Sequence, residues 1–141
     1  MRRLMAVLAL LLLTGCAEDT TKPAAAPSSK APNAACLPVS AAMLTALSEG
    51  AEKDVGKLTF TRGSAVLSPD FGHLYFIAAR FTANGIGVQT GVWASSKLDT
   101  NGLITSVDNF AKQFTVWPDA DKTQAKISTT DPSVDKARDC L

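Results

Sequence analysis

The sequence contains one histidine, His73, and this residue limits the nucleophilic catalysis that the chain could perform. A Ser-His-Asp set would need His73 together with Asp70 and either Ser64 or Ser68, which lie near it in the sequence. A catalytic triad is defined by geometry in space and not by proximity along the chain. The sequence also lacks the G-x-S-x-G turn that exposes the nucleophile of many hydrolases. We therefore predict no catalytic residues.

Two other patterns could in principle hold a cofactor or a metal ion. Gly85 and Gly87 begin a G-x-G pattern, but Thr90 stands where a dinucleotide-binding motif has its third glycine. Asp119 and Asp121 are spaced as in a calcium-binding loop, whose sixth position requires glycine where this chain has glutamine. A single histidine also leaves too few ligands for a transition metal once the cysteines are used as argued below. The sequence predicts neither a cofactor nor a metal.

The first sixteen residues have the layout of an export signal. Arg2 and Arg3 precede an unbroken apolar run, residues 4–13, which is much shorter than the roughly 20 residues that a membrane-spanning helix needs. The run ends in Leu13-Thr14-Gly15-Cys16, which resembles the lipobox of bacterial prolipoproteins at all four positions. The resemblance implies that diacylglyceryl chains, palmitate among them, are attached to the Cys16 sulfur. It also implies cleavage after Gly15, which makes residues 1–15 a removed signal peptide. The general secretory route is favoured over twin-arginine export because the arginines directly follow Met1.

The charge balance excludes one class of partner. The chain has 14 Lys and Arg against 13 Asp and Glu, whereas nucleic-acid binders normally carry a clustered basic excess. Cleavage would remove Arg2 and Arg3 and no acidic residue, so the mature chain would be slightly acidic. We therefore expect the membrane to be bound through the acyl chains on Cys16 and not through anionic lipid.

The segment after the lipobox predicts a tether. Residues 17–35 contain three prolines, many small residues and no aromatic or large aliphatic side chain. Such a segment cannot bury enough apolar surface to offset the entropy of ordering, so we expect residues 16–35 to form a disordered, lipid-anchored spacer.

If Cys16 is acylated, two cysteines remain, Cys36 and Cys140, near the two ends of the rest of the chain. An even pair in an exported protein predicts a disulfide, and the sequence has no C-x-x-C pair that would indicate redox chemistry. We expect this bond to tie the first helix to the last.

Residues 36–141 predict one α+β domain with an N-terminal helix, a four-stranded antiparallel meander, a further helix and a short C-terminal helix. The first helix is expected in residues 37–50, with Ser40 as its N-cap. The strands are expected in residues 57–62, 65–68, 73–82 and 86–96, with a turn at Gly63-Ser64. Ser106 is expected to cap the second helix, residues 124–129 to form one more short strand, and Asp131-Pro132 to begin the last helix. Short connections place the helices mainly on one sheet face.

The Asn84-Gly85 pair predicts a type I′ hairpin with a two-residue loop. That register places Phe76 opposite Trp93 and Ala78 opposite Gly91, on the face away from the helices. The four residues Phe76, Ala78, Gly91 and Trp93 would then form an exposed binding surface, unless Trp93 belongs to the core.

The arrangement is similar, as a fold analogy only, to cystatin-type and nuclear-transport-factor-type small domains, neither of whose motifs is visible. The segments 92–96 and 106–111 resemble parts of small actinobacterial lipoproteins of unknown function. These resemblances imply a lipid-anchored, extracytoplasmic protein of the cell envelope. We expect a non-catalytic module that binds an envelope protein, a cell-wall component or a small apolar ligand. The alternative is a small extracytoplasmic hydrolase or transferase.

Overall fold

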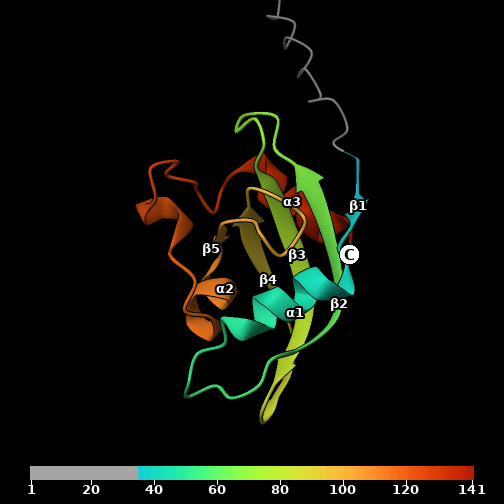
Figure 1. Cartoon of the computed structure of the whole chain (residues 1–141), viewed down its shortest axis with the longest axis vertical. Helices are drawn as coiled ribbons and strands as arrows, with labels where there is room; N and C mark the ends of the chain where they lie inside the picture. Colours follow the sequence, from blue (N-terminus) through green and yellow to red (C-terminus); the bar gives the residue numbers. More distant parts are fainter. Residues whose placement is uncertain (1–34) are drawn as a thin grey trace, which may run out of the picture. The chain divides into compact units, whose positions relative to one another are not determined.

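The computed structural model describes residues 35–141, which form an α+β structure around one five-stranded antiparallel sheet. The strands follow one another in the order β1-β2-β3-β4-β5 (Figure 1). Their bounds are β1 Leu37–Pro38, β2 Thr59–Leu67, β3 Tyr75–Ala83, β4 Ile86–Ser95 and β5 Ile104–Ser106. The helices are α1 Ala41–Glu49, α2 Asn109–Phe114 and α3 Pro132–Asp139, with a 3-10 turn η1 at Ala120–Lys122. The predicted signal peptide, Cys16 and the tether up to residue 34 lie outside the described residues.

The N-caps predicted for two helices are confirmed, but the first helix is shorter than predicted, because residues 37–38 form β1 and α1 begins at Ala41. The Ser40 side chain accepts a hydrogen bond from the Met43 N–H at 3.1 Å and caps α1. Asp131 caps α3 in the same way, with Pro132 in the first turn. The predicted cap of the second helix is wrong, because Asp108 and not Ser106 caps α2. The strand expected in residues 124–129 is absent from the described chain, and those residues form turns and loop.

The strands predicted in residues 57–62 and 65–68 are one continuous strand, β2. The sheet also contains two strands that were not predicted, β1 and β5. The expected turn at Gly63-Ser64 lies inside β2, where Gly63 pairs with Ala79 on β3. A Cβ atom at Gly63 would lie 2.8 Å from a methyl group of Leu44. This glycine therefore allows α1 to approach the sheet closely and does not make a turn.

The helices cover both faces of the sheet, so the prediction that they lie mainly on one face is wrong. On one face α1 and α2 cover an apolar cluster that includes Met43, Leu47, Phe81, Trp93 and Phe114. On the other face α3 packs on a second cluster, whose members include Val66, Phe76, Val92, Val134 and Ala137. Figure 1 shows α1 in front of the strands and α3 behind them. No helix of the described residues is long and apolar enough to cross a membrane.

The structure contains the predicted disulfide. Cys36 and Cys140 are bonded, with their Cα atoms 5.6 Å apart. Cys36 comes directly before β1, whose residues Leu37 and Pro38 pair with the edge of β2. The bond therefore ties the entry into the sheet, and not the first helix itself, to the end of α3.

Candidate binding site

The binding surface predicted from the hairpin register does not form. At the loop Ala83 pairs with Ile86 as expected. From Phe81 back to Tyr75, however, each β3 residue pairs with the β4 residue that lies one position later in the chain than predicted. Ile77, and not Phe76, lies opposite Trp93. Phe76, Ala78 and Trp93 are all fully buried, and Gly91 is buried beside the Trp93 ring.

A β-bulge near the hairpin loop explains the error. Outside glycine, only Lys126 has a positive φ among the described residues, so Asn84 lacks the conformation that a type I′ turn requires. The strands compensate with one extra β4 residue between the pairs Ala83–Ile86 and Phe81–Gln89. A shift of one residue moves every later side chain to the opposite face. Trp93 thereby joins the cluster under α1 and α2, whereas Phe76 joins the cluster under α3.

The buried Trp93 has a full set of partners. Its ring packs edge-on against Phe60 and Phe81, with centroids 5.5 and 6.0 Å apart. Its Nε1–H donates to Thr115 Oγ1 at 3.2 Å, and Thr115 in turn lies 3.0 Å from the hydroxyl of Ser106. A buried indole N–H normally needs such an acceptor. These contacts give Trp93 a structural role.

The residues considered for catalysis do not assemble. His73 is exposed in the turn before β3. Ser64 donates to the Leu37 carbonyl, and Ser68 accepts hydrogen bonds from the backbone N–H groups of Asp70 and Phe71. Among the described residues, His73 has no side-chain hydrogen bond to either serine or to Asp70. These polar groups support local turns and strand pairing.

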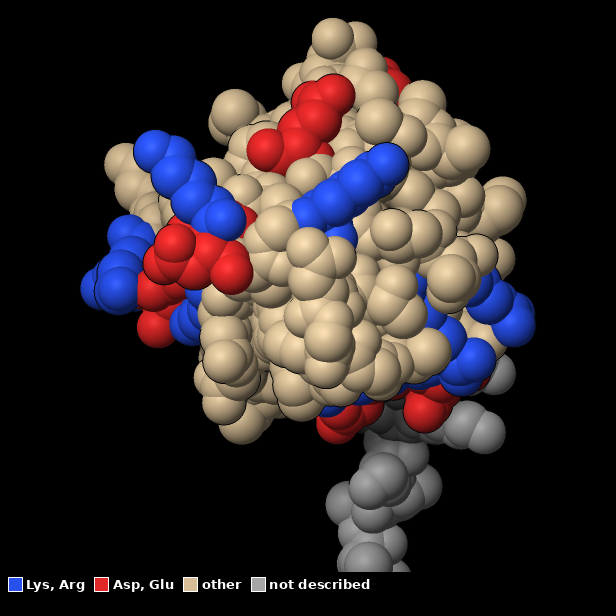
Figure 2. Space-filling view, turned by 90° about the horizontal axis from the view of Figure 1, so that it is seen from below, with Lys and Arg blue, Asp and Glu red and all other residues tan. Residues whose placement is uncertain are grey.

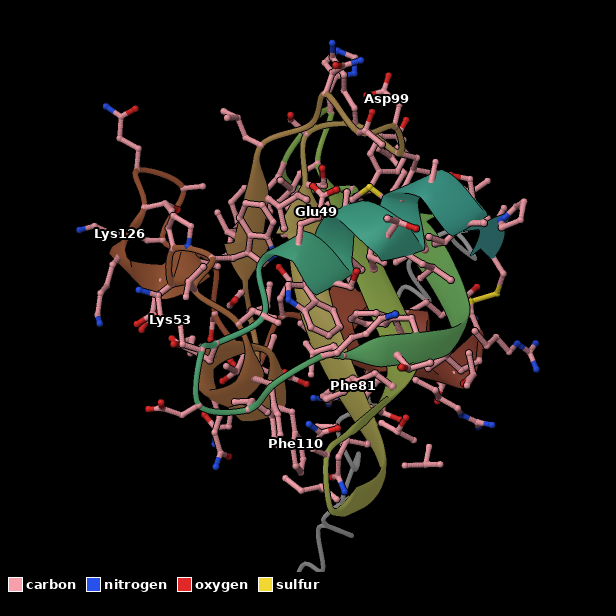
Figure 3. The ribbon with its side chains drawn as sticks, turned by 60° about the horizontal axis from the view of Figure 1, so that its bottom comes forward. Glu49, Lys53, Phe81, Asp99, Phe110 and Lys126 are labelled. Carbon is pink, nitrogen blue, oxygen red and sulfur yellow. A yellow bond between two sulfur atoms is a disulfide. The ribbon has the colours of Figure 1, made fainter. Side chains whose placement is uncertain are left out.

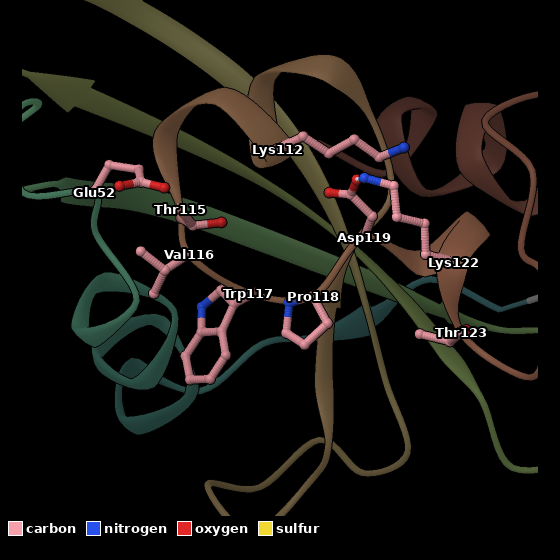
Figure 4. A pocket seen from close by; sticks show the side chains of 9 residues that line it. All are labelled: Glu52, Lys112, Thr115, Val116, Trp117, Pro118, Asp119, Lys122 and Thr123. Carbon is pink, nitrogen blue, oxygen red and sulfur yellow. Dashed lines mark ion pairs between the residues drawn. The ribbon is translucent and has the colours of Figure 1, made fainter.

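An open hollow lies beside the end of α2 (Figure 4). Its volume is about 410 Å³. Its apolar wall is the consecutive segment Val116, Trp117 and Pro118, and charged side chains surround it. The lining residues are Glu52, Lys112, Thr115, Val116, Trp117, Pro118, Asp119, Lys122 and Thr123. We call this hollow the α2 groove.

Backbone hydrogen bonds hold the wall of the α2 groove in an extended form. The Val116 N–H donates to the Gly50 carbonyl at 2.7 Å. On the other side, the Ser106 N–H donates to the Pro118 carbonyl at 2.9 Å. The Trp117 indole N–H reaches the Leu47 carbonyl at the end of α1 at 3.4 Å. The segment is thus fixed between α1 and β5, so its side chains are positioned before any ligand arrives.

Two ion pairs lie at the charged side of the α2 groove. Lys112 Nζ lies 2.9 Å from Asp121 Oδ1, and Lys122 Nζ lies 2.6 Å from Asp119 Oδ2. The hydrogen bond from Lys112 lowers the pKa of Asp121, and the hydrogen bond to Asp119 raises the pKa of Lys122. Both shifts favour the charged forms. On the opposite side Glu52 has no ion-pair partner among the described side chains. The groove therefore offers both signs of charge beside an indole ring.

A second hollow of about 480 Å³ lies on the other side of α2. It is lined by the loop 53–56, by Asn84 and Ile86 of the hairpin, and by Gln113 and Phe114. Phe110 projects from α2 towards the hairpin end of the molecule (Figure 3) and stacks on Phe114 with 6.4 Å between ring centroids. Its lining combines the charged residues Lys53 and Asp54 with the apolar residues Val55, Ile86 and Phe114.

Sequence reasoning missed the α2 groove. Val116, Trp117 and Pro118, an apolar run that directly precedes Asp119, were not singled out from the sequence. The sequence did contain a sign of a binding site here, because this apolar run follows a short helix and has Lys112 before it and Asp119 after it. The structure shows that Val116 is 58% exposed there.

Within the described residues, no group of three or more His, Cys, Asp and Glu side chains could hold a metal ion. The α2 groove combines a fixed backbone with charged side chains of both signs. No protein-family model matches the chain, and neither a curated protein nor a solved structure is significantly similar to it.

Proposed function

We propose that the protein is a lipid-anchored, extracytoplasmic binding module of the cell envelope, and that the α2 groove is its binding site. The lipobox Leu13-Thr14-Gly15-Cys16 supports the anchor. The disulfide between Cys36 and Cys140 is consistent with an oxidising compartment. The observation that carries the binding function is the prearranged Trp117-Pro118 wall between charged side chains of both signs.

The proposed anchor has a direct chemical test. Intact mass of the protein extracted from membranes should give a chain that begins at Cys16 and carries added acyl mass. Each buried methylene contributes about 0.8 kcal/mol, so two acyl chains give stable attachment. Cys16→Ser should abolish the acyl mass, whereas Cys36→Ser should leave it in place. A soluble wild-type product that begins at another residue would contradict the anchor.

The proposed ligand is a cell-wall component that combines sugar rings with short charged peptides. An indole face such as that of Trp117 offers an apolar surface on which a sugar ring can lie. Lys112 can attract a carboxylate, and Glu52 can attract an ammonium group. The groove is open, so it accepts a segment of a polymer and does not require a small enclosed molecule. A small apolar ligand fits these charges less well.

Tryptophan fluorescence can test the groove because the two tryptophans differ in burial. Trp93 is fully buried, whereas Trp117 is partly exposed at the groove. The probe is a set of soluble disaccharide-peptide fragments released from cell wall. We expect a saturable change in the Trp117 signal, weakened at least tenfold by Val116→Asp.

Leu103→Asp is the matched control for the groove experiment, because Leu103 is 80% exposed in the turn before β5 and does not line the groove. This variant should bind like the wild type. An unchanged fluorescence signal at millimolar fragment would contradict the proposal. Equal loss of binding in the Val116 and Leu103 variants would also contradict it.

A further inference from the structure

The three long strands of the sheet contain only two charged residues, and these lie directly opposite each other. Arg62 on β2 pairs with Arg80 on β3 in the antiparallel ladder. Residues opposed in this way share a face of the sheet, with their Cβ atoms about 4.5–5.5 Å apart. Like charges directly opposite each other destabilise a sheet, so this arginine pair has a cost that folding alone does not explain.

No acidic side chain of the described residues neutralises the arginine pair. Strands β2, β3 and β4 contain neither aspartate nor glutamate. On α3, the helix that packs on this face, Asp135 pairs with Arg138. Asp139 is also exposed, but it makes no ion pair with Arg62 or Arg80. Both arginines are themselves exposed, so their positive charges face solvent.

The arginine pair lies on the α3 side of the sheet, in the first row that this helix leaves uncovered. The row nearer to α3 consists of Ser64, Ala78 and Val92, all of which are buried. Residues two positions apart on a strand share a face, so the next row consists of the arginine pair and Thr90. Figure 2, seen from the hairpin end, shows basic side chains gathered on the right, which is the side of β2 in Figure 1. The pair therefore meets solvent at the perimeter of the sheet.

Threonine hydroxyls lie on both sides of Arg80. Thr90 pairs with Arg80 from β4. Thr82 follows Arg80 by two positions and pairs with Thr59 of β2, so both of these threonines share the face of the arginine pair. All three threonines are at least partly exposed. This end of the face thus combines two positive charges with neutral hydrogen-bond donors.

We propose that Arg62 and Arg80 form a binding site for a phosphate monoester group. A guanidinium carries N–H donors in a fixed fork that matches the oxygens of phosphates and carboxylates. A phosphate monoester has a charge between about −1.5 and −2 at pH 7 and three acceptor oxygens. It therefore matches two arginines in charge and can engage both guanidinium groups and the Thr90 hydroxyl, whereas a carboxylate has one charge and two oxygens. The bound group supplies the negative charge that the sheet lacks.

The phosphate site is separate from the α2 groove, because none of its residues lines that groove. Either proposal can therefore fail without the other. The attraction is local to this part of the sheet, since the whole chain has a formal net charge of only +1. The same group occurs on soluble phosphate esters and on phosphatidic acid in a membrane, and the experiment separates these two sources.

Thermal unfolding of the full-length protein tests the site, because a ligand that binds only the folded state raises the melting temperature. The protein is mixed with phosphatidylcholine vesicles. In one arm glycerol phosphate is added at tens of millimolar, and in the other arm phosphatidic acid is included in the vesicles. We expect the melting temperature to rise by at least ~3 °C over sodium chloride of the same ionic strength. Arg62→Gln and Arg80→Gln should each reduce this rise at least threefold.

Lys97→Gln is the matched control, because it removes one exposed positive charge just beyond the other end of β4. It should keep the rise of the wild type. In chloride alone both arginine variants should melt no lower than the wild type, since each removes the contact between like charges. An arginine-dependent rise in either arm supports the site, and the arm identifies the source. No arginine-dependent rise in either arm, an equal rise with sodium acetate, or an equal loss in Lys97→Gln would overturn the proposal.

Discussion

Removal of the disulfide should destabilise the protein mainly through its unfolded state. The bond joins residues separated by 104 positions, and closing a loop of about 100 residues restricts the unfolded chain by about 4.7 kcal/mol in the chain-entropy model. Cys36 is exposed and Cys140 is only partly buried, so replacing both by serine removes little packing. Val134 and Ala137 keep α3 on the sheet in either case. We therefore expect the double variant to retain the native fold and to lose about 4–5 kcal/mol of unfolding free energy.

Urea unfolding of the wild type and of Cys36→Ser/Cys140→Ser, followed by circular dichroism, measures this loss. Small domains are stable by about 5–15 kcal/mol, so the variant should unfold at much lower urea but remain folded without it. The near-ultraviolet spectrum should be unchanged, because the aromatic cluster around Phe81 and Trp93 does not include the bond. A loss below about 1 kcal/mol would refute the entropic reasoning. A changed native spectrum would show instead that the bond shapes the folded packing.

Three further perturbations test the core and the charged side of the α2 groove. Thr115→Val should lower the free energy of unfolding, measured with urea, by about 1–3 kcal/mol, because it leaves the buried Trp93 N–H without its acceptor. The loss should be smaller in a chain that also carries Trp93→Phe. Gly91→Ala should lower the free energy of unfolding by about 1–3 kcal/mol, since the added Cβ would lie 2.5 Å from the Trp93 ring. An unchanged melting temperature would mean that the ring can move. In Lys112→Gln the pKa of Asp121, followed by NMR, should rise towards its usual value of 3.8. The Lys112 contact stabilises the fold above that pH, and this stabilisation is lost as the pH falls through the lowered pKa of Asp121. An unchanged titration midpoint of Asp121 in Lys112→Gln would contradict this.

Short-range signals in the sequence predicted the starts of α1 and α3 because their physics is local. Ser40 and Asp131 accept backbone hydrogen bonds from residues two or three positions away, so their role depends on nothing distant. The disulfide was predictable for a different reason, since its two cysteines were left as a pair once Cys16 was set aside. These predictions required no knowledge of how the chain packs.

Predictions that depended on packing or on register failed. Gly63 was taken as a turn residue, but the approach of Leu44 from α1 requires a glycine at that position in a continuous strand. The hairpin loop was predicted at the right residues, yet a single extra β4 residue reversed the face on which Trp93 lies. Periodicity cannot reveal such a bulge, because residues 88–95 alternate equally well in either register. The placement of Trp93 depended on that one residue.

The burial of both sheet faces decides where this protein can recognise anything. A sheet with one exposed face could bind a ligand on its strands, but here α3 covers the face that was predicted to be exposed. Recognition is therefore restricted to the perimeter, where backbone groups or fixed side chains meet solvent. The Val116–Pro118 segment meets that condition, because its backbone is held between α1 and β5. It depends on α2 being short, since α2 ends at Phe114 and a longer helix would draw this segment out of its extended form. Extending α2 by one turn should therefore abolish the change in Trp117 fluorescence on ligand addition, as Val116→Asp should, whereas Leu103→Asp should leave it unchanged.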